Sequence, residues 1–101
     1  MSLLEGKVAV VTGGGNGLGR GHALALAAAG ARVVVNDLGG SVTGNGSGDA
    51  AQAVADEIRA AGGQAVANRA SVADWAGAAT IIAQAVATFG GLDIVVNNAG
   101  I

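Results

Sequence analysis

The sequence predicts an α/β domain in which a parallel sheet carries helices on both faces. Three observations support this fold class. Short β-branched apolar runs alternate with helical segments along the whole chain. The apolar runs do not alternate with polar residues, which is typical of parallel strands buried on both faces. Glycine is abundant, with 19 among 101 residues, and proline is absent, which fits tight turns and closely packed helices.

Four strands are expected, at residues 7–12, 32–37, 64–69 and 92–98, and the third is the weakest and most edge-like. Each strand is followed by a helical segment or by the end of the sequence. Because crossovers between parallel strands are right-handed, the expected spatial order of the strands is 3-2-1-4. The prediction is therefore a single three-layer domain over residues 1–101, truncated after strand four.

The first expected helix carries Leu18, His22 and Leu26 at intervals of four, which predicts that they share one packed face. His22 is the only histidine, and this spacing favours a packing role over a catalytic one. Arg20 is expected to be exposed at the start of the helix, with a phosphate contact as the alternative.

The second and third expected helices each begin at a capping box, Asp49 with Gln52 and Ser71 with Asp74, and each ends at paired glycines. Their predicted packing stripes are Val54, Ile58 and Ala61 in the second helix, and Trp75, Ala79, Ile82, Val86 and Phe89 in the third. Trp75 and Phe89 are assigned to the core or to an interface rather than to a substrate platform. Asp93, just before the apolar run of the last strand, is interpreted as a turn residue or as an acid that bonds to backbone.

Composition excludes several classes of protein. The sequence has no cysteine, so it has neither a disulfide framework nor a cysteine-ligated metal site. A net charge of −2 argues against nucleic-acid binding. No apolar run approaches the ~20 residues of a membrane span, and the first residues lack the pattern of a signal peptide. A soluble cytoplasmic protein is expected.

The segment after the first strand has the pattern of a dinucleotide-binding site. Gly13 permits a tight turn, Gly17 removes a side chain where a pyrophosphate approaches, and Gly19 lets the helix pack close to the sheet. Asp37 ends the second strand twenty residues after Gly17, where a carboxylate can accept hydrogen bonds from a ribose diol. A carboxylate at this place disfavours a 2′-phosphate, so NAD is predicted over NADP.

A glycine-rich stretch, residues 38–49, breaks the pattern of short connections. It is interpreted as a mobile surface loop, and a flap beside the adenosine end of the ligand is the alternative.

The chain resembles the short-chain dehydrogenase/reductases, whose Thr-Gly-x-x-x-Gly-x-Gly motif matches residues 12–19 and whose Asn-Asn-Ala-Gly signature matches residues 97–100. It is most similar to the (3R)-hydroxyacyl-CoA dehydrogenase and 3-oxoacyl reductase members. The resemblance implies a Rossmann-type fold and a cofactor site made of Gly13, Asn16, Gly17, Leu18, Gly19, Asp37, Ser71, Val72, Asn98, Ala99 and Gly100. Ala70 stands where the family often has an Asp beside the adenine, which should weaken adenine recognition.

The resemblance also implies a Ser-Tyr-Lys catalytic scheme whose residues follow the Asn-Asn-Ala-Gly signature. This sequence has no tyrosine, and its only lysine, Lys7, begins the first strand, away from the ligand edge. We therefore expect the NAD-binding half of an oxidoreductase, with no catalytic or metal-binding residue and no activity by itself. A stand-alone dinucleotide-binding module and a structural half-domain that binds nothing remain as alternatives. Self-association through the unpaired edge of strand four is also expected.

Overall fold

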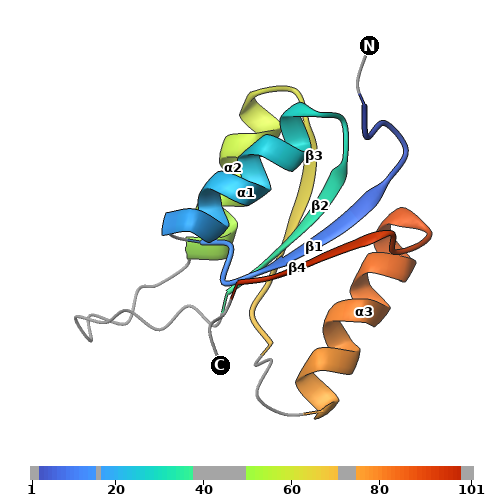
Figure 1. The fold of residues 1–101 in the computed structure, drawn as a ribbon. Helices are drawn as coiled ribbons and strands as arrows, with labels where there is room; N and C mark the ends of the chain where they lie inside the picture. The colour runs from blue at the N-terminus through green and yellow to red at the C-terminus, as the bar shows by residue number, and fades with distance from the viewer. Residues whose placement is uncertain (1–2, 16, 38–49, 71–74, 99–101) are drawn as a thin grey trace.

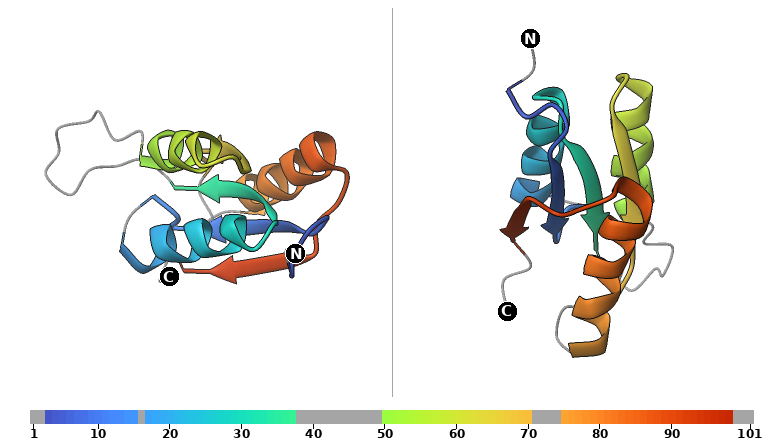
Figure 2. Two further views of the ribbon diagram at one scale, coloured as in Figure 1. Left: turned by 90° about the horizontal axis from the view of Figure 1, so that it is seen from above. Right: turned by 90° about the vertical axis from the view of Figure 1, so that its right-hand side faces the viewer.

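A computed structural model describes residues 3–15, 17–37, 50–70 and 75–98 of the chain. The elements follow in strict alternation: β1 (Val8–Thr12), α1 (Gly17–Ala28), β2 (Arg32–Asn36), α2 (Ala50–Ala60), β3 (Gln64–Asn68), α3 (Trp75–Phe89) and β4 (Ile94–Asn97). The four strands form one parallel sheet in the order β3-β2-β1-β4. Helices α1 and α2 cover one face and α3 covers the other (Figures 1 and 2). The predicted fold class, strand order and alternation are confirmed.

The core has two parts, one on each face of the sheet, because successive strand residues point to opposite faces. On the side of α1 and α2, the buried residues Ala9, Val11, Val33 and Val35 pack with Ala23, Val54 and Ile58, among others. On the side of α3, the smaller cluster consists of Val8, Val10, Val34, Ile81 and Ala85. The strand residues of β1 and β2 are almost completely buried, as their uninterrupted apolar runs predicted.

The predicted packing face of α1 is wrong for two of its three members. Leu18 is 78% exposed and His22 is exposed, whereas Leu26 packs partly against the core cluster on this face. Gly19 and Ala23 are the buried residues of this helix. The physical reason is that a helix packs close to a sheet through its smallest side chains. His22 is therefore not a packing residue.

The predicted stripe of α3 is likewise wrong for most of its members. Trp75 is 88% exposed, and Ile82 and Val86 are about half exposed, while Ile81 and Ala85 face the sheet. Phe89 alone of the predicted stripe packs partly against the core cluster on this face. In α2 the prediction is confirmed for Val54 and Ile58, which are buried, and not for Ala61, which is exposed beyond the end of the helix.

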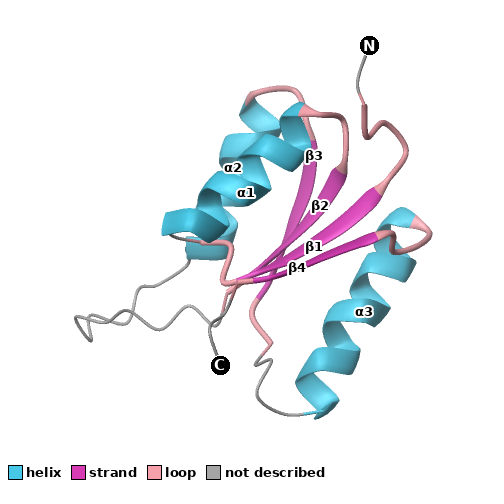
Figure 3. Ribbon diagram, in the orientation of Figure 1, coloured by secondary structure: helices cyan, strands magenta, loops and turns pink. Residues whose placement is uncertain are grey.

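The strand β4 lies at one edge of the described sheet and pairs with β1 (Figure 3). Asp93 fixes its start, because the Asp93 carboxylate accepts a hydrogen bond from the backbone N–H of Val8 at 2.9 Å and its own N–H donates to the Val8 carbonyl at 2.8 Å. This confirms the predicted backbone-bonding role of Asp93. Val95 points to the α3 side, where no described helix covers it, and is 59% exposed.

Candidate functional site

The candidate site lies at the edge of the sheet where the strands end. Because all four strands are parallel, the residues that follow β1, β2 and β4 meet at this edge (Figure 1). The glycine loop of residues 13–15, Asp37 and Asn98 come together here through the hydrogen bonds described below. The site is therefore assembled by the topology from segments that lie far apart in the sequence.

The glycine loop leaves β1 in a conformation that needs glycine. Gly13 and Gly17 have φ angles of +65° and +55°, in the left-handed region that L side chains rarely adopt. The Gly14 N–H donates to the carbonyl of Asn36 at 2.8 Å, which ties the loop to the end of β2. Helix α1 begins directly after this turn at Gly17, so its first-turn N–H groups face the site with the positive end of the helix dipole.

Gly19 is the point where α1 touches the loop and the end of β4. A Cβ atom on Gly19 would overlap the carbonyl oxygen of Gly13 and would lie 2.7 Å from the side-chain nitrogen of Asn98. The Asn98 side chain donates to that same carbonyl at 3.4 Å. Gly19 therefore lets the helix, the glycine loop and the residue after β4 occupy adjacent positions, whereas the sequence predicted only close packing of the helix on the sheet.

Thr12 joins the glycine loop to the Asn-Asn-Ala-Gly signature. The Thr12 hydroxyl accepts a hydrogen bond from the Asn98 N–H at 3.0 Å and can donate to the Val96 carbonyl or to the Asn97 side chain, at 3.3 and 3.2 Å. The two sequence motifs are thus physically connected. Sequence reasoning used Thr12 only as part of a pattern and missed this connecting role.

Asp37 lies directly beside the glycine loop. Its carboxylate oxygen Oδ2 accepts a hydrogen bond from the Gly15 N–H at 3.0 Å, and its own N–H donates to the Asn68 carbonyl at 3.0 Å. The negative charge at the end of β2 is therefore held against the loop that the sequence assigns to a pyrophosphate. The sequence predicted a carboxylate at the end of this strand, and its contact with a ribose diol stays a prediction.

A buried polar network supports the site from below, and sequence reasoning missed it. The Asn36 side chain donates to the Asn68 side-chain oxygen and to the Ala70 carbonyl, both at 2.9 Å. Asn68 in turn donates to Gln84 of α3 at 2.6 Å. The signal in the sequence is an asparagine at the last position of two otherwise apolar strands, with a glutamine in an apolar helix. The network fixes the start of the chain segment that follows β3.

Other residues singled out by the sequence lie away from the site or outside the described residues. Arg20 is exposed, as predicted, and its guanidinium forms a two-point ion pair with Glu57 of α2, at 2.6 and 3.2 Å. Lys7 is exposed at the opposite edge of the sheet. Five predicted site residues fall outside the described residues: Asn16, Ser71, Val72, Ala99 and Gly100. The stretch 38–49 falls outside them too.

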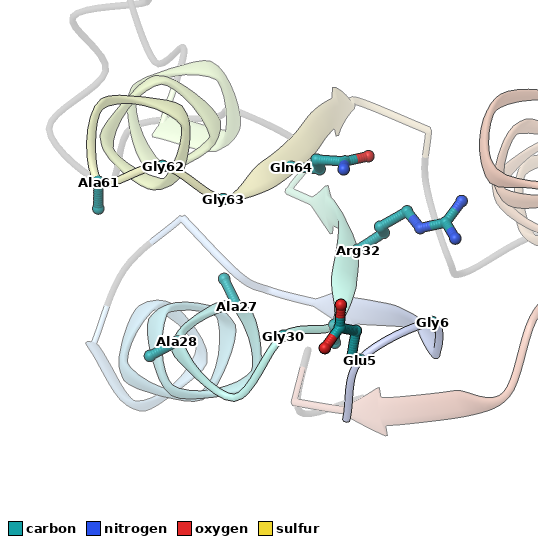
Figure 4. A pocket seen from close by; sticks show the side chains of 11 residues that line it. Glu5, Gly6, Ala27, Ala28, Gly30, Arg32, Ala61, Gly62, Gly63 and Gln64 are labelled. Carbon is teal, nitrogen blue, oxygen red and sulfur yellow. The ribbon is translucent and has the colours of Figure 1, made fainter. Parts of the chain in front are cut away.

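A pocket of about 610 Å³ lies at the other edge of the sheet, between the last turns of α1 and α2 (Figure 4). Its polar side chains are Glu5, Arg32 and Gln64, and the Arg32 guanidinium donates to the Phe89 carbonyl at 3.3 Å. Helix C-termini repel anions, so this pocket does not suit a phosphate. Within the described residues, no group of three or more acidic or histidine side chains could hold a metal ion. None of the described helices is both long and apolar enough to cross a membrane.

Comparison with known proteins identifies the family. The sequence profile described as short chain dehydrogenase matches residues 7–101. The chain belongs to the short-chain dehydrogenase family. Members of this family bind a nicotinamide dinucleotide, and the family assignment agrees with the glycine loop and with the connection through Thr12 to the end of β4.

Among individual short-chain dehydrogenases and related proteins, the chain is 57% identical over 98 residues to peroxisomal multifunctional enzyme type 2 of Drosophila melanogaster, covering 96% of this chain and 16% of that protein. A short chain dehydrogenase from Mycobacterium avium has a crystal structure that superposes with a TM-score of 0.90 at 60% identity, covering 100% of this chain and 35% of that chain. A 7α-hydroxysteroid dehydrogenase, solved with NADH and 7-oxo glycochenodeoxycholic acid, gives a TM-score of 0.81 at 38% identity, with coverages of 91% and 33%. The chain thus spans about a third or less of these relatives.

Proposed function

We propose that residues 1–101 are the incomplete, N-terminal part of an NAD(P)-binding Rossmann domain, whose complete protein transfers hydride between NAD(H) and an alcohol or carbonyl substrate. A 3-hydroxyacyl thioester is the substrate class that the family resemblance favours. The observation that carries the NAD assignment is the Asp37 carboxylate, held beside the glycine loop by the Gly15 N–H at 3.0 Å. NADH itself supplies the hydride in this chemistry, and the described residues supply binding and orientation.

The described residues fit a dinucleotide in three ways. Gly13 and Gly17 adopt left-handed conformations that favour glycine, so the turn carries no side chain at these positions. The first turn of α1 presents N–H groups to an anion. Asp37 is placed to accept hydrogen bonds from a ribose diol and to repel a 2′-phosphate. In the proposed site, Gly13, Gly17, Leu18 and Gly19 line the pyrophosphate side, and Asn98 lies on the nicotinamide side. The family resemblance adds five further residues to the proposed site: Asn16, Ser71, Val72, Ala99 and Gly100.

Asp37→Ala tests this function directly. Loss of hydrogen bonds to a charged acceptor is expected to weaken NAD binding about 10- to 100-fold. Binding of NADP should not weaken, because the substitution removes the charge that repels a 2′-phosphate. Isothermal titration of both nucleotides into the variant and into the unsubstituted chain makes the comparison. An Asp37→Ala chain that binds NAD as well as the unsubstituted chain would rule out the proposed role.

The same titration separates the alternatives. A dinucleotide-binding module without catalysis predicts NAD binding but no turnover, whereas a structural half-domain predicts a folded chain with no heat of binding. We expect the 101 residues to bind NAD without transferring hydride, since the sequence has no tyrosine and its only lysine lies at the far edge of the sheet. Cytoplasmic localisation stays a prediction, and the Drosophila relative is described as peroxisomal.

We also propose that the chain self-associates through β4. In the described sheet β4 pairs on one side only, and Val95 is 59% exposed on an edge that can pair with another strand. Sedimentation velocity at tens of micromolar is expected to show dimers or larger species. A charge at the edge opposes strand pairing, so Val95→Lys should shift the chain toward monomer, while Ala60→Lys on the exposed side of α2 should not. A monodisperse monomer of the unsubstituted chain would contradict this proposal.

A further inference from the structure

Three chain segments meet at Gly15, and the absence of a side chain there permits the meeting. Gly15 is buried, and its N–H donates to Asp37 Oδ2 at 3.0 Å. A Cβ atom on Gly15 would lie 2.5 Å from the Cβ of Ala50, the first residue of α2, and 2.9 Å from Asp37 Oδ2. The glycine loop, the end of β2 and the first turn of α2 therefore share one contact, which the sequence pattern did not reveal.

Neither neighbour can yield freely to a side chain at position 15. The first turn of α2 is anchored by Ala51, which is fully buried in the core, and by Val54 one turn later. The backbone of Asp37 is fixed by its hydrogen bond to the Asn68 carbonyl. The Asp37 carboxylate is the most movable of the groups in contact, because it can rotate about its side-chain bonds. Turning the carboxylate would relieve the 2.9 Å contact but not the 2.5 Å contact with Ala50. A methyl group on Gly15 would therefore also push the glycine loop away from α2, which moves the Gly15 N–H and releases the Asp37 carboxylate that it holds.

We propose that Gly15, in contact with Ala50, is the positioning residue that makes the site select NAD over NADP. It acts by holding the Asp37 carboxylate in one orientation. This inference rests on the proposed NAD function and names the feature of the chain that produces the selectivity. A fixed carboxylate both accepts from a ribose diol and opposes a 2′-phosphate, and a displaced carboxylate does neither well.

The test is Gly15→Ala, with affinities for NAD and NADP measured by isothermal titration. Loss of one oriented, charge-assisted contact is expected to lower NAD affinity about tenfold. The ratio of NAD affinity to NADP affinity should fall by a similar factor, since NADP gains from the displaced charge. Gly91→Ala is the matched control, because a Cβ on Gly91 meets no atom within 4 Å and Gly91 lies before β4 at the opposite edge. It should leave the ratio unchanged.

Two further variants separate positioning from general damage to the fold. Ala50→Gly added to Gly15→Ala removes the 2.5 Å contact but keeps the 2.9 Å contact with Asp37, so the ratio should recover in part. In a chain that already carries Asp37→Ala, the Gly15 substitution should not change the ratio further. If Gly15→Ala alone does not fold by circular dichroism, the double variant carries the test, and its ratio should still lie below that of the unsubstituted chain.

The outcomes distinguish this inference from the proposed function. If the unsubstituted chain binds no NAD, or binds NADP as well as NAD, both are overturned. If the unsubstituted chain prefers NAD and the folded Gly15 variants keep that preference within about twofold, the positioning role alone is overturned. The positioning role is also overturned if the Gly15 variants lose affinity for NAD and for NADP by the same factor, because that result indicates a structural role without selectivity.

Discussion

Gly19→Ala is expected to destabilise the chain and to weaken NAD binding, although alanine is a better helix former than glycine. The added Cβ would overlap the Gly13 carbonyl oxygen and approach its carbonyl carbon to 2.8 Å, and both atoms belong to backbone that the end of β1 holds in place. Overpacking of this kind costs about 1–3 kcal/mol. The displaced loop and the first turn of α1 are the proposed pyrophosphate site, so NAD affinity should fall at least about tenfold.

Gly21→Ala provides the matched control for this prediction. It lies in the same helix two residues later, and a Cβ there meets no atom within 4 Å. It should raise the free energy of unfolding by about 0.5–1 kcal/mol through helix propensity alone. Urea unfolding followed by circular dichroism measures both variants. A Gly19→Ala chain that gains stability as Gly21→Ala does would contradict the close contact between α1 and the glycine loop.

Asn36→Asp replaces one side-chain nitrogen by oxygen. Among such substitutions near the site, we expect it to lower the free energy of unfolding the most. Asn36 is 2% exposed, and its side-chain nitrogen donates to the Asn68 side chain and to the Ala70 carbonyl at 2.9 Å each. A carboxylate would place a negative charge against these acceptors and remove the donor that they share. The Asn68 oxygen would keep only the Ala70 N–H, at 2.8 Å. The cost of such a buried, unpartnered charge is about 3 kcal/mol or more.

For a chain of this length, that cost lowers the Tm by more than about 10 °C. Acidification should reduce the deficit, because the protonated carboxyl group can donate to one of the acceptors. Asn97→Asp is the control, since Asn97 is exposed at the end of β4 and its oxygen accepts from Thr12, which a carboxylate can also do. Thermal unfolding of the two variants at neutral pH should differ strongly. Equal Tm values would show that the Asn36 network does not support the fold.

The sequence predicted the sheet well because each strand carries its own signal. The apolar runs ending at Thr12 and Asn36 specify buried parallel strands, and the run ending at Asn97 specifies a parallel strand that is only half-buried. Right-handed crossovers then leave one strand order. Gly13, Gly17 and Asp37 lie at the carboxyl edge of the sheet, as the sequence indicated, and their roles toward a ligand stay predictions. Their conformations and positions follow from where a strand ends, which is a local property of the sequence.

The faces of α1 and α3 were not predictable in the same way. Periodicity identified Leu18 in α1 and Ile82 and Val86 in α3 as parts of the packing stripes. The sheet is instead covered through Gly19 and Ala23 of α1 and through Ile81 and Ala85 of α3. Small residues give little periodic signal, yet they permit the closest approach of a helix to a sheet. Which face of a helix contacts the sheet depends on how closely the helix can approach the sheet, and this distance cannot be derived from the sequence pattern.

The contacts between distant segments were also beyond the sequence. Neither the pairing of Asn36 with Asn68 nor the meeting of Gly15, Asp37 and Ala50 follows from spacing, because each joins residues on different elements. A polar residue at the end of an apolar strand is normally interpreted as part of a turn. The structure shows instead that two such residues form the buried support of the site.

The central claim is that this chain carries a dinucleotide site that selects NAD. Isothermal titration of the unsubstituted chain with NAD and, separately, with NADP tests it most directly. We expect saturable binding of NAD and at least about tenfold weaker binding of NADP, because in the proposed site Asp37 would accept from the ribose diol and would repel a 2′-phosphate. A folded chain that gives no heat with NAD, or that binds the two nucleotides equally, would contradict the claim.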